Sequence, residues 1–281
     1  MILIADCGST KIDWCAVRAG KVEKQVFTCG MNAVMLTEDE MRGRIAAELM
    51  PELGAIAADI EAVYFYGAGC ISPEVCANVE RAIRANIPAA STVEVHTDLL
   101  AAPRALCGHG PGIACILGTG SNSCYYDGTR IVDNVSPLGY ILGDEGSGAV
   151  LGKLLVGDLL KGQLPAELCE EFLRRYDLTL LDIIRRVYKE PQGNRFLASL
   201  TPFLLEHIDV PQVHDLVVGS FTAFFRRNVA HYAGMCEPVA NFIGSIAHYY
   251  RKPLAEAAVK AGFSVGTILK SPMEGLIRFH S

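Results

Sequence analysis

The sequence predicts an α/β protein made of two halves, each a mixed sheet with crossover helices. Two glycine-rich turns carry this prediction: Asp6–Lys11 after the apolar run Ile2–Ala5, and Gly118–Ser123 after Ile113–Leu117. A strand that runs into Gly, Ser and Thr gives a tight turn with free backbone N–H groups and hydroxyls, which suits a phosphate. Because each turn is followed by further short strands, we expect duplicated halves that face each other across a nucleotide.

The first half is expected to hold five strands and two helices. Thr37 and Glu40 form a capping-box pattern, which predicts a helix that runs to about Met50. Pro73 follows Ser72, as is typical of the first helical position, and predicts a helix to about Asn86. The expected strands are Ile2–Ala5, Asp13–Val17 and Val22–Thr28 (joined by a hairpin loop at 18–20), Ala62–Tyr66, and Thr92–His96.

The second half repeats the three-strand opening after a glycine-rich boundary at 107–112. The stretch from about 148 to 231 is helical in pattern, and a helix from Ser245 to about Ala261 follows the later strand. Ser271 and Glu274 form another capping-box pattern, which predicts a short terminal helix. The expected strands are Ile113–Leu117, Asn122–Tyr126, Arg130–Val135 and Val239–Ile243.

Composition excludes some classes of protein. A chain of 281 residues with 51% hydrophobic residues is large enough for two domains with real cores. The formal net charge of -6 argues against nucleic acid as the main partner. None of the ten cysteines forms a Cys-x-x-Cys pair, and several lie in apolar runs, so we expect buried thiols in a reducing compartment. Neither a secretion signal nor a membrane-spanning run is visible, which favours a cytoplasmic protein.

Four acidic residues are candidates for chemistry. Asp6 ends a buried strand at the first turn, where a carboxylate suits Mg²⁺ on nucleotide phosphates; the plainer reading is a capped hairpin turn. Asp98 ends a strand and begins a helix, so it is either a helix cap or a general base that takes a proton from an attacking hydroxyl. Asp144 and Glu145 stand among glycines before a helix. The plainer reading is an acidic helix start that the helix dipole stabilises. The functional readings are that these carboxylates accept hydrogen bonds from sugar hydroxyls or hold a metal's water.

These pieces, in this order, resemble the N-acetylglucosamine kinase family, which also includes ATPase components and activators of benzoyl-CoA and related dehydratase–reductase systems. The resemblance spans nearly the whole chain and rests on four motifs: Asp-x-Gly-Ser-Thr-Lys at 6–11, Thr-Asp at 97–98, Gly-Thr-Gly-Ser-Asn-Ser at 118–123 and Leu-Gly-Asp-Glu-Gly-Ser at 142–147. It implies two actin-like (ribonuclease H-like) ATPase domains, 1–109 and 110–270, with a central cleft. The terminal helix, 271–281, is expected to pack on the first domain.

The resemblance also implies roles for particular residues. Asp98 matches the catalytic base and also lies at the substrate. Asp6 is expected near Mg²⁺. The implied ATP-binding residues are Gly8, Ser9, Thr10 and Lys11 in the first turn, Gly118, Thr119, Gly120 and Ser121 in the second, and Gly244 and Ser245 in an adenosine motif. The implied sugar-binding residues are Asn32, Gly143, Asp144 and Glu145. Two positions depart from the family pattern: Ile243 replaces the first glycine of the adenosine motif, and Leu138 stands where an aromatic residue is common.

The activity implied is that of an ATP- and Mg²⁺-dependent sugar kinase, which phosphorylates N-acetylglucosamine or a close amino sugar at the 6-hydroxyl. One alternative is an activator-type ATPase that couples hydrolysis to electron transfer through an iron–sulfur cluster, for which Cys70 and Cys76 are the only close cysteine pair in a loop region. The other is a non-catalytic sugar sensor. As partners we expect a small-molecule sugar, with a homodimer as the candidate assembly, and neither nucleic acid nor a membrane.

Overall fold

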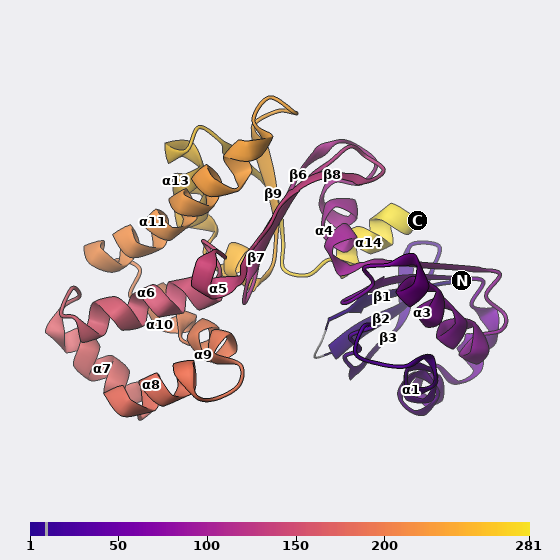
Figure 1. The fold of residues 1–281 in the computed structure, drawn as a ribbon. Helices are drawn as coiled ribbons and strands as arrows, with labels where there is room; N and C mark the ends of the chain where they lie inside the picture. Colours follow the sequence, from indigo (N-terminus) through magenta and orange to yellow (C-terminus); the bar gives the residue numbers. More distant parts are fainter. Residues whose placement is uncertain (9–10) are drawn as a thin grey trace. The chain divides into compact units, whose positions relative to one another are not determined.

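The computed structural model describes residues 1–8 and 11–281, which divide into two compact units. The first unit comprises Met1–His109 and Pro272–Ser281, and the second comprises Gly110–Ser271. Ser9 and Thr10, which the sequence assigns to the first phosphate turn, lie outside the described residues. Each unit is built on a five-stranded sheet with helices (Figure 1), so the predicted α/β fold class is confirmed.

The sheet of the first unit has the order β3-β2-β1-β4-β5. Its strands are β1 (Ile2–Cys7), β2 (Lys11–Arg18), β3 (Lys21–Cys29), β4 (Ala62–Gly67) and β5 (Thr92–Thr97). The first three strands pair antiparallel as hairpins, whereas β4 and β5 run parallel to β1. Cys7, Gly67 and Thr97 are aligned across the parallel strands. The segments that leave these three strands therefore begin at one edge of the sheet.

Two helices of the first unit begin where the sequence places them. The Thr37–Glu40 capping box is present, and Ser72 caps the helix that starts at Pro73. The terminal helix packs against α4 (Figure 1), and Gly275 makes this close approach feasible, since a Cβ there would lie 2.3 Å from the carbonyl oxygen of Ala105. The helical segments are α1 (Glu38–Arg44), the π-helical η1 (Ile45–Leu49), α2 (Met50–Leu53), the 3-10 segment η2 (Gly54–Asp59), α3 (Pro73–Asn86), α4 (Asp98–Cys107) and α14 (Met273–His280).

The sheet of the second unit has the order β10-β9-β6-β7-β8, which repeats the topology of the first. Its strands are β6 (Gly112–Leu117), β7 (Ser121–Tyr126), β8 (Ile131–Val135), β9 (Val239–Ile243) and β10 (Ser264–Leu269). β6, β7 and β8 form antiparallel hairpins, and β9 and β10 continue the sheet in parallel on the other side of β6. The two halves are therefore duplicated, as the paired glycine turns predict.

Most of the second unit's helices lie between β8 and β9, as expected. Its core is rich in phenylalanine, with Phe221, Phe224 and Phe225 of α11 packed near Phe242 of β9. Fully burying each such side chain stabilises the fold by about 1.5–3 kcal/mol. The helical segments are α5 (Gly139–Leu142), α6 (Gly148–Leu160), α7 (Ala166–Tyr176), α8 (Leu180–Tyr188), α9 (Gly193–Ser199), α10 (Thr201–Glu206), α11 (Pro211–Arg227), the 3-10 segment η3 (Val229–Tyr232), α12 (Ser245–Tyr249) and α13 (Arg251–Lys260).

Three local predictions are wrong. Strand β10 is absent from the expected elements, because it is a half-exposed edge strand interrupted at Gly266, where the register shifts. The helix expected from Ser245 to Ala261 is two helices, broken at Tyr250, whose buried hydroxyl donates to the carbonyl of Thr201. The terminal helix begins at Met273 without the capping box expected at Ser271, and the Glu274 carboxylate accepts instead from Arg278.

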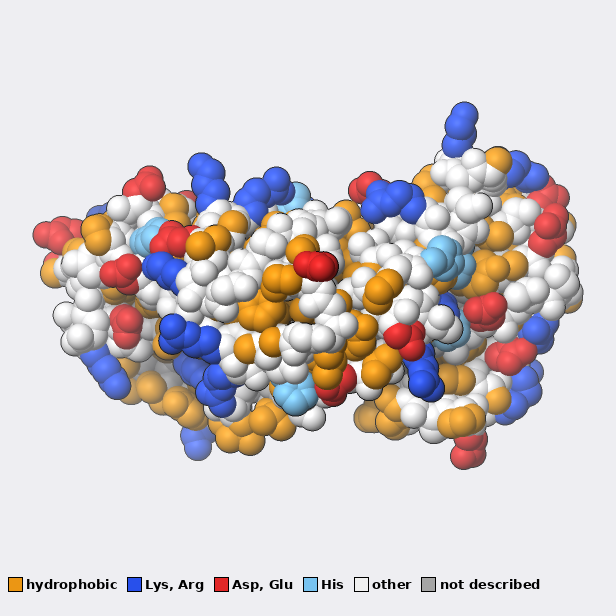
Figure 2. Space-filling view, turned by 90° about the horizontal axis from the view of Figure 1, so that it is seen from above, with side chains coloured by type: hydrophobic (Ala, Val, Ile, Leu, Met, Phe, Trp, Pro, Cys, Tyr) orange, Lys and Arg blue, Asp and Glu red, His pale blue; other side chains and the backbone are white. Residues whose placement is uncertain are grey.

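The surface is mixed in charge. Figure 2 shows Lys and Arg side chains interspersed with Asp and Glu, and with scattered hydrophobic side chains. In the described part of the chain, no helix is long and apolar enough to cross a membrane.

Candidate active site

The first glycine turn is closed by its own backbone. Gly8 donates its N–H to the carbonyl of Lys11 at 3.0 Å, immediately after β1. The Lys11 ammonium lies 4.8 Å from the centre of the Phe27 ring, a cation–π contact that places this cation beside the turn. The Cys7 thiol donates to the carbonyl of Met31 at 3.1 Å and so ties the end of β1 to the loop after β3. Gly8 and Lys11 thus frame the turn on both sides.

Asp6 carries a strongly perturbed carboxyl group. It lies directly across from Asp13 in the β1–β2 pair. Burial, together with the negative charges of Asp13 and Asp98, raises the pKa of Asp6 to about 6, against the opposing charge of Lys11. Asp98 therefore acts on Asp6 electrostatically, and the structure brings these two sequence-predicted acids together at one edge of the sheet.

Asp98 is the first residue of α4, but it is not the helix cap. Thr97 is the N-cap, and its hydroxyl accepts from the N–H of Leu99 at 3.4 Å. The Asp98 Oδ1 atom accepts from the same Leu99 N–H at 3.0 Å and from the Thr97 hydroxyl at 3.2 Å. Among the described residues these bonds go to Oδ1 alone, so Oδ2 of this exposed carboxylate is open. Thr97, and not Asp98, therefore stands at the N-cap position.

Asn32 is held against the turn that follows β4. Its Oδ1 atom accepts from the N–H of Val34 at 3.2 Å, and Ala33 donates its N–H to the carbonyl of Ala68 at 3.0 Å. Gly69 has a φ of +82°, and a Cβ at this position would lie 2.3 Å from the Asn32 Oδ1. Only glycine satisfies both conditions, so Gly69 fixes where the Asn32 side chain lies.

The second glycine turn is bound to the start of α6. Gly118 donates its N–H to the carbonyl of Gly120 at 3.0 Å, which closes the turn between β6 and β7. The first N–H groups of α6 then bond outward: Gly148 to the carbonyl of Gly118 at 2.8 Å, and Ala149 to that of Thr119 at 3.0 Å. Ser121 begins β7 and is buried. The turn is therefore fixed by a helix, as a rigid phosphate loop requires.

The predicted adenosine motif packs directly on this turn. Gly244 has a φ of +122°, and a Cβ there would lie 2.2 Å from the carbonyl oxygen of Leu117, the last residue of β6. Ser245 follows as the first residue of α12. Ile243 is buried as the end of β9, where it pairs with Ile116 and contributes to the sheet. Although Ile243 departs from the family pattern, the glycine that the close contact with Leu117 requires, Gly244, is present.

The acidic loop before α6 is also anchored to the second turn. The Asp144 carboxylate accepts from the backbone N–H groups of Ser121 and Gly139, and burial raises its pKa, with a further contribution from the charge of Glu145. A Cβ on Gly120 would lie 3.0 Å from Asp144 Oδ2. Gly143 is equally constrained, since a Cβ there would lie 2.2 Å from the Pro137 carbonyl oxygen.

Glu145 points toward the end of α11. Its Oε1 atom accepts from Arg227 Nε at 2.9 Å, and its Oε2 atom accepts from Asn228 Nδ2 at 3.4 Å. Its side chain is only 14% exposed. Leu138, the other departure from the family pattern, is 62% exposed at a φ of 64°, and begins the short helix α5.

A solved structure of a candidate N-acetylglucosamine kinase from Porphyromonas gingivalis is similar over the full length. The two chains share 51% sequence identity with a TM-score of 0.92, covering 100% of this chain and 98% of that one. The chain belongs to the N-acetylglucosamine kinase family. No protein-family model matches this sequence, and no curated protein does.

Two solved structures with lower sequence identity share the fold of this chain. A candidate N-acetylglucosamine kinase from Chromobacterium violaceum matches with a TM-score of 0.74 at 17% identity, covering 100% of this chain and 99% of that one. A ROK family glucokinase from Streptomyces griseus, solved with glucose and AMPPNP, matches with a TM-score of 0.58 at 16% identity, covering 98% and 96%. The chain therefore has the two-domain fold of the actin-like ATPase superfamily.

Within each unit, this family member gathers the predicted residues into one region. In the first unit Asp6, Gly8, Lys11 and Asp98 lie at the edge where β1 and β5 end, and Asn32 is bound to the turn after β4. In the second unit the glycine turn at 118–121, the motif at 244–245 and the loop at 143–145 contact one another. Sequence reasoning missed Asp13, Gly69 and Arg227. The Asp6–Asp13 pairing can be found from the sequence, by pairing the residues of the two strands outward from the hairpin turn. No local pattern indicates Arg227.

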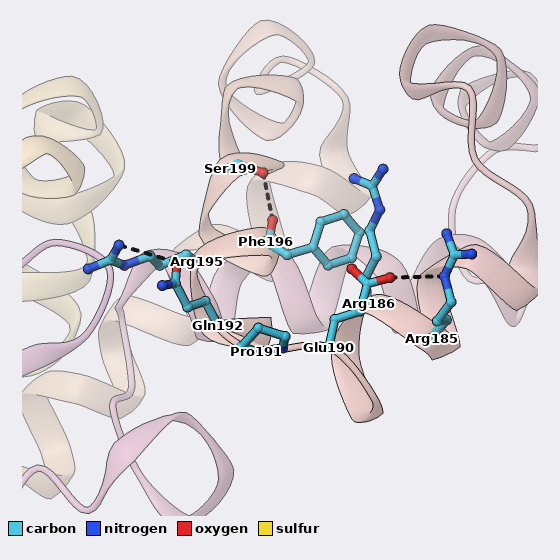
Figure 3. Close-up of a pocket in the computed structure, with 8 residues that line it drawn as sticks. All are labelled: Arg185, Arg186, Glu190, Pro191, Gln192, Arg195, Phe196 and Ser199. Atoms are coloured by element: carbon cyan, nitrogen blue, oxygen red, sulfur yellow. Dashed lines mark hydrogen bonds and ion pairs between the residues drawn. The ribbon is translucent and has the colours of Figure 1, made fainter. Parts of the chain in front are cut away.

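A hollow of about 420 Å³ lies elsewhere in the second unit of this family member, on the connection between α8 and α9 (Figure 3). Arg185 there pairs with Glu190 at 3.0 Å, and the Arg186 guanidinium lies 5.1 Å from the centre of the Phe196 ring. None of the sequence-predicted site residues lines this hollow.

Proposed function

We propose that this protein is an ATP-dependent kinase that phosphorylates N-acetylglucosamine, or a close amino sugar, at the 6-hydroxyl. The observation that carries the proposal is the full-length similarity to the Porphyromonas gingivalis protein, which is described as a candidate N-acetylglucosamine kinase. Two local features support it: each unit holds a glycine turn at the end of its first strand, and in the first unit a carboxylate with an open oxygen follows β5 at the same sheet edge as one of these turns.

Asp98 is proposed as the general base. The two hydrogen bonds to Oδ1 orient the carboxylate and leave Oδ2 for the substrate. As the sugar oxygen bonds to the γ-phosphorus of ATP, its proton passes to Asp98 and the bond to the β,γ-bridging oxygen breaks, which releases ADP. The protein's contribution is mainly positioning and charge stabilisation. The proposed phosphate contacts are the residues of the two glycine turns with Lys11, and Gly244 and Ser245 for the adenosine.

Mg²⁺ is proposed as the metal, near Asp6. Among residues 1–8 and 11–281, no three His, Cys, Asp or Glu side chains form a metal-binding group. Mg²⁺ needs no such cage, because it is commonly held by one or two carboxylates together with nucleotide phosphates. Burial and the negative charges of Asp13 and Asp98 raise the pKa of Asp6 to about 6, and a neighbouring cation would offset these charges. When bound, the ion would neutralise charge on the phosphates.

The sugar is proposed to contact Asn32, Gly143, Asp144 and Glu145. The Asp144 carboxylate already accepts two backbone N–H groups and is 9% exposed, so only its remaining lone pairs are offered to hydroxyls.

An acceptor screen tests the proposal. The purified protein is given ATP and Mg²⁺ with N-acetylglucosamine, other amino sugars or plain hexoses, and ADP release is measured for each. We expect the highest kcat/KM with N-acetylglucosamine, and NMR of the product should show phosphorus coupled to the protons on C6. Equal rates with glucose, or phosphate on another hydroxyl, would contradict the assignment of acceptor and position. No phosphorylated sugar at all would contradict the kinase.

A further inference from the structure

The C-terminal part of α11 holds the loop that carries Glu145. Arg227, the last residue of α11, donates from Nε to Glu145 Oε1 at 2.9 Å, and Asn228 donates to Oε2. One residue further along the loop, Gly146 donates its N–H to the buried Ser220 hydroxyl, also on α11, at 3.2 Å. Three groups from one helix and its C-terminal cap thus bind two consecutive loop residues.

The loop needs such support because its backbone is strained. Asp144 has a φ of 56° and Gly146 a φ of 73°, so both residues around Glu145 are in the left-handed region. A non-glycine residue there costs energy that neighbouring contacts must offset. The partly buried Glu145 carboxylate also needs a partner, since an unpaired charge with little solvent is costly.

Arg227 approaches from the solvent side. Its side chain is 65% exposed, whereas that of Glu145 is 14% exposed. A guanidinium bond to one carboxylate oxygen and an amide bond to the other set the plane of the carboxylate and still leave lone pairs for hydroxyls. A carboxylate held in this way meets a ligand without losing further rotational freedom.

We propose that Arg227 is a positioning residue for sugar recognition: it does not touch the sugar, but fixes the Glu145 carboxylate in the orientation that binds it. The inference rests on the proposed function, because it requires Glu145 to contact the sugar. It adds that sugar affinity depends on a cation of α11, which the motif of the acidic loop does not contain.

The chain offers a matched control in the preceding residue. Arg226 carries the same charge on the same helix and is exposed, and across the described residues it forms no ion pair. Arg226 and Arg227 also line the same hollow of about 400 Å³ beside Lys260. Replacing either arginine removes the same charge from this surface, but only Arg227 contacts Glu145.

The experiment compares Arg227→Ala, Arg227→Lys, Arg226→Ala and Glu145→Ala in the full chain, with ATP and N-acetylglucosamine as substrates. We expect Arg227→Ala to raise the KM for the sugar about 5- to 10-fold and to leave the KM for ATP unchanged, because a charged hydrogen bond is lost at Glu145 alone. The unfolding temperature should fall only slightly, since Asn228 and Ser220 still hold the loop. Arg227→Lys should recover part of the loss, and Arg226→Ala should behave as the wild type. In the Glu145→Ala background, Arg227→Ala should not raise the KM for the sugar any further.

The outcomes separate the two claims. If Glu145→Ala raises the KM for the sugar but Arg227→Ala matches Arg226→Ala, the positioning role is wrong and the proposed sugar contact stands. If Arg227→Ala raises both KM values equally, its role is structural and the inference fails. If Glu145→Ala leaves the KM for the sugar unchanged while phosphorylation persists, the sugar contact itself is wrong, and the inference falls with it.

Discussion

Asp98 has one carboxylate oxygen bonded to the start of α4 and the other open. An aspartate at the N-cap position would direct its carboxylate to the backbone N–H groups of the first turn. Here the capping task belongs to Thr97, so Asp98 Oδ2 is available for a proton. The geometry therefore favours the base over the cap.

Asp98→Asn tests this assignment. The amide keeps the size of the side chain and an oxygen that can accept from Leu99, but it cannot take up the hydroxyl proton. We expect kcat to fall about 10²–10⁴-fold, the contribution typical of a positioned base. The Kd for N-acetylglucosamine, measured by titration calorimetry, should stay close to that of the wild type. A variant with wild-type kcat would show that the proton goes elsewhere.

Single residues of the candidate site could be predicted from the sequence only where the neighbouring residues in the chain mark them. Asp6, Asp98 and Glu145 are visible because each follows a strand or a glycine in the sequence. Arg227 is invisible because its partner lies far away in the chain, and only the packing of α11 brings the two together. The sequence equally could not reveal that the Asp144 carboxylate accepts from the backbone of the second turn.

Among the elements, the turn after β4 shows how one glycine sets a proposed contact. Gly69 combines a φ of +82° with a gap too small for a Cβ beside Asn32. Gly54 also has a positive φ, of +54°, but a Cβ there would meet nothing within 4 Å. Substitutions at Gly54 and Gly69 therefore both strain the backbone, but only a substitution at Gly69 also displaces Asn32.

We expect Gly69→Ala to raise the KM for the sugar, and Gly54→Ala to leave it unchanged. Both should lose stability from the strained φ, by about 1–2 kcal/mol. Kinetics and urea unfolding of the two variants give both quantities. Unfolding of the first unit can be followed by the fluorescence of Trp14, the single tryptophan, which is buried there. Equal sugar KM values for the two variants would argue against Asn32 as a sugar contact.

The docking of α14 predicts a dependence of stability on pH. The His280 ring stacks on Tyr64 at 3.7 Å, and its Nε2 is 2.7 Å from the Tyr66 hydroxyl. Burial, together with the charge of Arg104 and the neighbouring His96 and His109, lowers the pKa of His280 from 6.5 to about 4. The unfolded chain therefore binds a proton that the folded chain does not, between about pH 6.5 and pH 4.

Because the unfolded state binds more protons at His280 in this range, the contribution of His280 to the free energy of unfolding should fall as the pH drops from 6.5 to 4. Asp6, whose pKa is raised to about 6, contributes in the opposite direction, so the test compares slopes between the wild type and a variant. His280→Phe keeps a ring to stack on Tyr64 but cannot be protonated, so its stability should fall less steeply. Burial also lowers the pKa of His96, so the stability of the variant should still depend on pH in this range. Urea unfolding by Trp14 fluorescence at several pH values measures this, and identical slopes for the two proteins would contradict the account of α14.

Elements whose signals are local were predicted well from the sequence. The capping box at Thr37 and the Ser72–Pro73 start of α3 specify their helices without tertiary help. Strand β10 was missed because its pairing depends on a side chain from β9: Asn241 accepts from the Thr267 N–H at 2.9 Å where the register shifts. The start of α14 was set by packing on α4 rather than by a cap.

For the whole molecule, the repeated strand order is the strongest link between sequence and fold. Two glycine turns in one sequence predicted two halves, and the sheets repeat the same order around β1 and β6. Such duplication is expected for the actin-like ATPase superfamily, to which the chain belongs. The fold alone does not choose an acceptor. That choice rests on the loops that carry Asn32, Asp144 and Glu145.

The most direct test of the central claim measures sugar-stimulated ADP release and iron content on one preparation. If the protein is an N-acetylglucosamine kinase, it should be colourless, and ADP release should rise sharply when N-acetylglucosamine is added, with sugar phosphate formed in equal amount. Binding of the correct sugar would then complete the catalytic site. Stoichiometric iron with ATP hydrolysis that ignores the sugar would contradict the kinase and favour the activator. A colourless protein that binds the sugar without ADP release would contradict it in favour of a sensor.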